Sequence, residues 1–128
     1  MSKTRVLVVD DAIFMRNMIK DIFAGEAFEV IGEAANGVEA VEKYKELKPD
    51  LTTMDIVMPF KSGIEATKEI LSFDKEALIV MCSALGQESL VMEAIDAGAA
   101  DFVVKPFKPE DVQRVVQKVL NARQQPNA

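Results

Sequence analysis

Residues 51–59 read LTTMDIVMP, and the first five of them decide the fold. Leu51–Asp55 is a short run of apolar and β-branched residues that ends in a carboxylate. Such runs are typical of strands in a parallel sheet, because helices cover both faces of these sheets. We therefore predict that Leu51–Asp55 is a buried strand with Asp55 at its carboxyl end.

Four further runs have the same character and are predicted strands: Arg5–Asp10, Phe28–Ala34, Leu78–Cys82 and Asp101–Val104. Helical spacing of apolar residues is found in Met15, Met18, Ile19 and Ile22, and again in Val112, Val115, Val116, Val119 and Leu120. Weaker helical patterns cover Gly37–Leu47, Ile64–Leu71 and Gln87–Ala97. Five strands alternating with five helices predict an α/β domain with a parallel sheet.

Local signals support these boundaries. Ser62 and Glu65 have the spacing of a capping box at the start of the third helix. Pro109 suits the first position of the last helix, and Gly98 suits the carboxyl-terminal cap of the fourth. Asn36-Gly37 is a turn signal before the second helix.

The bulk composition narrows the function classes. The 128 residues fit one domain, which we place at 1–122, followed by a polar tail at 123–128 that we expect to fray. A net charge of −6 argues against nucleic acid and anionic membranes as partners. No stretch approaches the ~20 apolar residues of a spanning helix, and no signal-peptide pattern is found. The single cysteine, Cys82, fits a reducing compartment, so we expect a cytoplasmic protein.

Reactive side chains gather where the predicted strands end. They are Asp10 and Asp11, Asp55, Ser83, and Lys105, from the first, third, fourth and fifth strands. Ligand chemistry in open α/β sheets takes place at the carboxyl ends of the strands. We therefore expect three carboxylates, a hydroxyl and an amine at one edge of the sheet.

Neighbouring carboxylates repel one another, so this edge needs positive charge. Lys105 supplies one charge, and a divalent cation would supply more. Oxygen ligands select Mg²⁺, Mn²⁺ or Ca²⁺ over zinc, and the sequence has no histidine. Mg²⁺ suits phosphoryl chemistry, because it keeps places for water and for phosphate oxygens.

Asp55 is the candidate nucleophile. Cys82 is predicted to be buried in its strand, and no histidine is present to activate Ser83. A carboxylate attacks phosphorus directly and gives an aspartyl phosphate. Taken singly, each residue also has a structural explanation, since strand-end aspartates form turns or cap helices and a lysine is ordinarily solvated. Four methionines are taken as core residues: Met15, Met18, Met54 and Met81.

Several segments match a known family, in order and at the right spacing. They are Val8–Asp11, Met54–Pro59, Gly63, Cys82–Ala84 and Phe102–Phe107. On these segments the chain resembles the receiver domains of bacterial two-component response regulators over nearly its whole length. On Asp10–Arg16 and Cys82–Gln87 it is most similar to the stand-alone chemotaxis regulators. The resemblance implies a flavodoxin-like (βα)5 fold, a doubly wound five-stranded parallel sheet with strand order 2-1-3-4-5.

The resemblance also implies a role for each strand-end residue. Asp55 would be the phosphoacceptor. Mg²⁺, for which Mn²⁺ can substitute, would be held by Asp10, Asp11, Asp55 and the backbone carbonyl of Val57. Lys105 would pair with a phosphoryl oxygen, and its peptide bond to Pro106 would be cis.

Ser83 and Phe102 would form the switch of such a domain. Ser83 would bind the phosphoryl group and move towards it, and Phe102 would turn into the vacated space. Many relatives have Thr in place of Ser83; because serine keeps the hydroxyl, switching should survive. Many chemotaxis relatives have Tyr in place of Phe102; because Phe has no phenolic hydroxyl, packing alone would hold the active state. Val57 and Leu85 occupy positions that influence phosphoryl lifetime in the family. Because both are apolar, we expect slow autodephosphorylation.

The implied partners are proteins, with no nucleic acid and no membrane. A histidine kinase or its phosphotransfer domain would supply the phosphoryl group, with Ile13 and Phe14 either docking it or partly buried. The face of the fourth helix, fifth strand and fifth helix would bind an output protein with an acidic segment, such as the flagellar motor switch. Its basic residues are Lys105, Lys108, Arg114 and Lys118. A phosphatase is a further partner, and we expect a monomeric switch that catalyses only its own phosphorylation and dephosphorylation.

Other functions stay open at this point. The same chemistry would serve a phosphorelay intermediate or the receiver domain of a transcriptional regulator. A P-loop hydrolase is disfavoured, because Gly32–Gly37 is followed by Val38 and Glu39 in place of Lys and Ser or Thr. Two aspartates after the first strand would repel the phosphate of a flavin or dinucleotide. A haloacid-dehalogenase-like phosphatase would need its nucleophile on the first strand, and a degenerate receiver would not need the strand-end residues.

Overall fold

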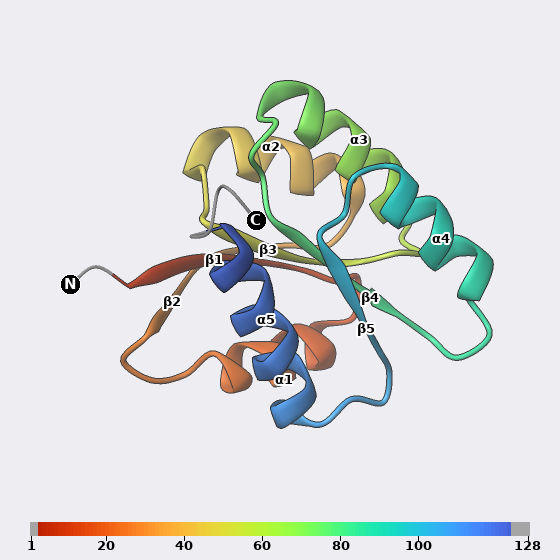
Figure 1. Ribbon diagram of the computed structural model, residues 1–128. Helices are drawn as coiled ribbons and strands as arrows, with labels where there is room; N and C mark the ends of the chain where they lie inside the picture. Colours follow the sequence, from red (N-terminus) through yellow and green to blue (C-terminus); the bar gives the residue numbers. More distant parts are fainter. Residues whose placement is uncertain (1–2, 124–128) are drawn as a thin grey trace.

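The computed structural model describes residues 3–123 as one five-stranded parallel sheet with helices on both faces (Figure 1). The strands are β1 (Thr4–Val9), β2 (Phe28–Ala34), β3 (Leu51–Asp55), β4 (Ile79–Ser83) and β5 (Asp101–Val104). Their order is β2-β1-β3-β4-β5, and all four neighbouring pairs are parallel. The predicted fold and strand order are confirmed.

Five helices cover the sheet: α1 (Ile13–Ile22), α2 (Gly37–Leu47), α3 (Gly63–Phe73), α4 (Glu88–Asp96) and α5 (Pro109–Arg123). In Figure 1, α1 and α5 lie below the sheet and α2, α3 and α4 lie above it. Ile19 and Val116 belong to the lower core, and Tyr44 and Ile70 to the upper one. The central strand β3 is therefore buried on both faces, as its run of apolar and β-branched residues predicts.

The helix ends follow their sequence signals. Ser62 and Glu65 form the predicted capping box, in which each side chain accepts from the other residue's backbone N–H. Gly98 has φ +113° and follows α4, with its N–H bonded to Ile95 and the next N–H bonded to Ala94. This is a Schellman ending, which requires the left-handed conformation that glycine adopts without strain.

Several boundaries differ from the predictions by one or two residues. Ser83 is the last residue of β4 rather than the residue after it, and α3 continues beyond Leu71 to Phe73. Arg123 is still helical, and residues 124–128 of the predicted tail lie outside the described part of the chain.

The prediction that Met18 belongs to the core is wrong, because its side chain is 44% exposed. Met54 and Met81 are fully buried, and Met15 packs against the lower core. The buried stripe of α1 is centred on Ile19, and each helical residue is rotated about 100° from the one before. Met18 therefore falls at the edge of the stripe, one turn after the exposed Phe14.

Gly63 lets the start of α3 approach the end of β3. Its N–H donates to the carbonyl oxygen of Ile56 at 2.7 Å. A Cβ atom at this position would lie 2.0 Å from the backbone carbonyl oxygen of Asp55. Because the obstacle is backbone, it cannot swing away, so Gly63 fixes the loop that leaves Asp55.

We predict that Gly63→Ala lowers the free energy of unfolding by roughly 3 kcal/mol, because the new methyl group must displace the end of the central strand. The control is Gly25→Ala, where φ is +139° but no atom lies within 4 Å of the added carbon. That control carries only backbone strain, roughly 1–2 kcal/mol. Urea unfolding followed by circular dichroism measures both, and equal losses would refute the steric explanation.

Candidate functional site

Strands β1 and β3 bring two aspartates to the same edge of the sheet. Val9 pairs with Met54, so the next residues of each strand, Asp10 and Asp55, lie side by side. Both are buried, at 1% and 9% exposure, whereas Asp11 is exposed. Carboxylate oxygens of the three residues lie within 4.8 Å of one another.

Lys105 reaches this acidic cluster from the end of β5. Its Nζ lies 3.0 Å from Oδ2 of Asp10 and 3.3 Å from Oδ1 of Asp55. The backbone N–H of Lys105 donates to the carbonyl oxygen of Ser83 at 2.7 Å, which anchors the start of the side chain next to β4. The peptide bond between Lys105 and Pro106 is cis.

Burial and like charge make ionisation of Asp55 unfavourable. Burial raises the pKa of Asp55 to about 6, the charges of Asp10 and Asp11 add to the effect, and Lys105 opposes it. Burial alone would lower the pKa of Lys105, but its hydrogen bond to Asp10 and the charge of Asp55 raise it overall. The lysine therefore stays charged and compensates only part of the acidic cluster.

The hydroxyl of Ser83 is buried without a partner. Ser83 is 1% exposed, and within residues 3–123 its Oγ is one of three buried side-chain oxygens that lack a hydrogen bond, with Thr52 and Thr53. Leaving such a group unsatisfied costs about 1–3 kcal/mol. Because β4 pairs Cys82 with Asp55, Ser83 stands one residue further along at the same edge. A ligand oxygen at this edge would relieve the cost.

Phe102 and Ser83 both line a groove between α4 and β5. The groove has a volume of about 320 Å³ and is lined by both residues together with apolar side chains such as Val91 and Met92. Phe102 is 38% exposed, so its ring is directed partly to solvent. The structure thus brings the two predicted switch residues to one cavity.

The donor atoms at this edge fit a hard cation. They are carboxylate oxygens, and within residues 3–123 no histidine or thiolate competes, since Cys82 is buried and burial raises its pKa to about 12. Such a set suits Mg²⁺ or Mn²⁺. Val57 is 57% exposed and follows Asp55 by two residues. The use of its carbonyl as a ligand stays a prediction.

Arg16 was not singled out by the sequence analysis as a site residue. Its Nη1 donates to the backbone carbonyl of Asp10 at 2.6 Å, and its Nε donates to Glu33 at 2.9 Å. The hydrogen bond from Lys20 lowers the pKa of Glu33, burial opposes this, and Arg16 adds to the lowering. The sequence feature that points to Arg16 is a basic residue in the first turn of α1, six positions after Asp10.

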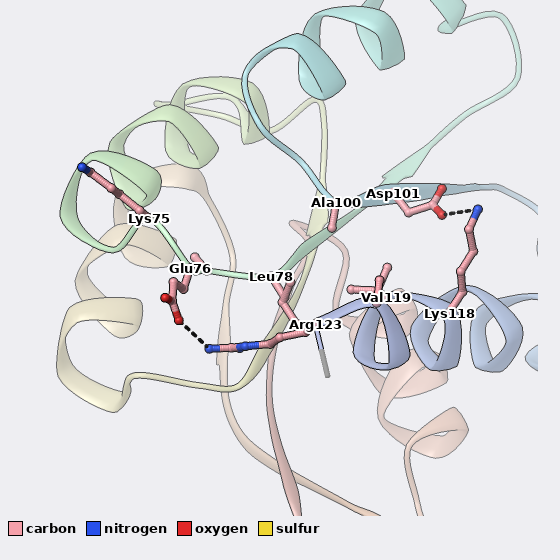
Figure 2. Close-up of a pocket in the computed structure, with 10 residues that line it drawn as sticks. Lys75, Glu76, Leu78, Ala100, Asp101, Lys118, Val119 and Arg123 are labelled. Carbon is pink, nitrogen blue, oxygen red and sulfur yellow. Dashed lines mark ion pairs between the residues drawn. The ribbon is translucent and has the colours of Figure 1, made fainter. Parts of the chain in front are cut away.

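A second cavity, of about 540 Å³, lies at the amino-terminal ends of β4 and β5, away from the acidic edge (Figure 2). Two ion pairs cross its rim, Lys118 with Asp101 at 3.3 Å and Arg123 with Glu76 at 3.6 Å. None of the strand-end residues lines it, although Lys118 of the predicted output face does. Because ligand chemistry in such sheets takes place at the carboxyl ends of the strands, the acidic edge remains the candidate site.

Within residues 3–123, no helix combines the length and the apolar character that a membrane crossing requires.

Comparison with known proteins gives consistent matches. The family model described as "Response regulator receiver domain" matches residues 6–117. "Chemotaxis protein CheY" of Thermotoga maritima is 61% identical over 90% of this chain and 96% of its own length. "Chemotaxis protein CheY" of Bacillus subtilis is 59% identical over 91% of this chain and 98% of its own. A chain of the CheX-CheY-BeF3-Mg+2 complex from Borrelia burgdorferi is 42% identical with a TM-score of 0.86, over 91% of this chain and 88% of that one.

We predict that Asp55→Asn stabilises the metal-free protein in a pH-dependent way. The pKa of Asp55 is about 6 in the folded protein and 3.8 when unperturbed, so the fold loses stability as the pH rises from 3.8 and the loss is complete above about pH 6. The variant should gain roughly 2 kcal/mol at pH 7.5 and less than half of that at pH 4.5, where folded Asp55 is protonated.

Urea unfolding in the presence of a chelator, at both pH values, measures this gain. Asp96→Asn, which removes an exposed carboxylate from the end of α4, is the matched control and should change stability little. A gain from Asp55→Asn that is equal at both pH values, or a loss at pH 7.5, would contradict the interpretation.

Proposed function

The chain belongs to the response regulator receiver domain family, and from that premise we propose that Asp55 is the residue that receives the phosphoryl group. Members of the family that resemble chemotaxis regulators are phosphorylation-activated signalling switches rather than enzymes with separate substrates. The observation that carries the proposal is the placement of Asp55 beside Asp10, with Lys105 bridging the two carboxylates; Asp55 is buried and has a raised pKa.

The proposed reaction moves a phosphoryl group from a histidine kinase, or its phosphotransfer domain, to Asp55. An Oδ atom of Asp55 forms the new bond to phosphorus while the bond between phosphorus and the donor's imidazole nitrogen breaks, and the nitrogen keeps the electron pair. Asp10, Asp11, Asp55 and the carbonyl of Val57 would hold Mg²⁺, or Mn²⁺ in its place, which neutralises charge on the phosphoryl oxygens.

Phosphorylation would give Lys105 and Ser83 new partners. Lys105 bridges Asp10 and Asp55 in the unphosphorylated protein, and one of its contacts would pass from the Asp55 carboxylate to a phosphoryl oxygen. The unpartnered Oγ of Ser83 would donate to another. As Ser83 moves, Phe102 would turn into the groove that both residues line. The phosphoryl charge would thereby be coupled to a change of Ser83 and Phe102 between two arrangements.

The outer surfaces suit protein partners. Ile13 and Phe14 are each 65% exposed near the acidic edge, which favours a docking role for them over partial burial. On the face of α4, β5 and α5, Leu85 and Met92 are 77% and 62% exposed. We propose that this face binds the output protein, in chemotaxis the flagellar motor switch, through apolar contacts and through basic groups such as Lys118.

The proposal also covers the pathway, a further partner and the state of the protein. The chain is 61% and 59% identical to two proteins named "Chemotaxis protein CheY", which favours chemotaxis over a phosphorelay or a DNA-binding regulator. The structural neighbour from a CheX complex supports a phosphatase as an additional partner. We also propose a cytoplasmic monomer, a domain at residues 1–122, and catalysis limited to the protein's own phosphorylation and dephosphorylation.

We predict that beryllofluoride with Mg²⁺, a mimic of the bound phosphoryl group, shifts NMR resonances along the proposed route. Amides of Asp55, Ser83, Phe102 and Lys105 should shift, and the changes should continue into α4 and α5. Asp55→Asn and a metal-free sample are the controls, and the shifts should vanish in both. Shifts limited to the loops that carry the aspartates would mean that a ligand binds without switching.

We predict that Val57→Asn combined with Leu85→Glu shortens the lifetime of the phosphorylated protein. Both residues are exposed, at 57% and 77%, and polar groups there can orient an attacking water where the apolar ones cannot. Decay should accelerate roughly 10-fold, less than the 10²-fold of a well-placed general base. Phosphate release after removal of the phosphodonor measures the rate. Val57→Leu with Leu85→Met is the control, and equal decay in all three proteins would refute the prediction.

A further inference from the structure

We infer that Arg16 is a positioning residue for the acidic cluster, because it holds the backbone from which Asp10 and Asp11 project. The inference rests on the proposed function, in which these aspartates bind Mg²⁺. It assigns to Arg16 no contact with the metal or with the phosphoryl group.

Arg16 is held in one orientation by two bonds. Its Nε donates to Oε1 of Glu33 on β2 at 2.9 Å, and its Nη1 donates to the carbonyl oxygen of Asp10 at 2.6 Å. The side chain is only 14% exposed. Lys20, one turn further along α1, donates to Oε2 of the same Glu33 at 2.7 Å. Glu33 thus aligns the guanidinium, whose planar fork can satisfy two acceptors at once.

The bond from Arg16 completes the set of contacts around Asp10. The N–H of Asp10 donates to Ala34 at 3.1 Å, Oδ1 accepts from the N–H of Ala12 at 2.9 Å, and Oδ2 accepts from Lys105 at 3.0 Å. The carbonyl oxygen is the remaining polar group, and it points to Arg16. This carbonyl belongs to the peptide plane that joins Asp10 to Asp11.

Asp11 depends on that peptide plane more than Asp10 does. Its side chain is exposed, and within residues 3–123 no hydrogen bond or ion pair orients it. Its direction is therefore set by its own backbone, which begins at the plane that Arg16 holds. Without the bond from Arg16, the Asp11 carboxylate should adopt several orientations. This would weaken a cation site that uses one oxygen from each of the three aspartates.

A purely electrostatic role and a positioning role of Arg16 predict opposite changes in Mg²⁺ affinity when the residue is replaced. If Arg16 acted only through its positive charge beside three carboxylates, then removing the charge would tighten Mg²⁺ binding. If Arg16 acts by positioning, removing it weakens binding, since losing an outer-shell partner typically costs 10–100-fold in metal affinity. The direction of the change therefore identifies the mechanism.

Isothermal titration of the full chain with Mg²⁺ tests the inference. We expect Arg16→Met to bind Mg²⁺ about 10-fold more weakly than the unaltered protein, at the lower end of the range for outer-shell partners. Lys20→Met is the matched control, because Lys20 makes the same kind of bond to Glu33 but does not reach Asp10. It should stay within about 2-fold of the unaltered protein.

A second readout does not involve the metal. In the metal-free protein, the amide resonances of Asp11 and Ala12 should move in Arg16→Met and stay in place in Lys20→Met. Arg16→Lys covers the case in which Arg16→Met does not fold. It keeps the charge but cannot make both bonds of the fork, so it should also bind about 10-fold more weakly.

Two outcomes separate this inference from the proposed function. If the unaltered protein binds Mg²⁺ and Arg16→Met or Arg16→Lys binds it equally well or more tightly, the positioning role is overturned and the proposed function stands. If the unaltered protein binds no Mg²⁺, the metal-dependent function fails and the inference fails with it.

Discussion

Three carboxylates with oxygens within 4.8 Å of one another repel each other, and this repulsion determines the chemistry of the acidic edge. Asp10 and Asp55 extend from paired strands in the middle of the sheet, so they cannot move apart. One lysine relieves part of the repulsion, while burial, and after it the charge of Asp10, still raise the pKa of Asp55. A bound cation would neutralise the remaining negative charge. The cation and Lys105 together would then stabilise a phosphoryl group at this edge.

The fold separates a rigid part from a responsive one. The acidic edge is built on β1 and β3, which are covered by helices on both faces, and Gly63 locks the following helix against the end of β3. The groove between α4 and β5 is different, because Ser83 lacks a hydrogen bond there and Phe102 is only partly covered. Under the proposed function, a charge added at the acidic edge would lead to a movement at this groove, on the face proposed to bind the output protein.

The sequence predicted the parts that depend on local pattern or on strand ends. Five apolar runs and their alternation with helices yield the fold, and the strand ends bring Asp10, Asp55 and Lys105 together. Two kinds of feature were out of reach. Helical spacing indicates a stripe but not its width, so Met18 was wrongly placed in the core. The contact of Arg16 with Glu33 depends on how α1 lies against β2, which no local pattern encodes.

Phosphorylation of Asp55 is tested most directly by the intact mass of the protein after incubation with a small-molecule phosphodonor and Mg²⁺. We expect one added phosphoryl group, located on Asp55 by borohydride reduction and peptide mapping, and none when Mg²⁺ is chelated before the phosphodonor is added or when Asp55 is replaced by Asn. A phosphoryl group that persists in Asp55→Asn, or none in the unaltered protein, would contradict it.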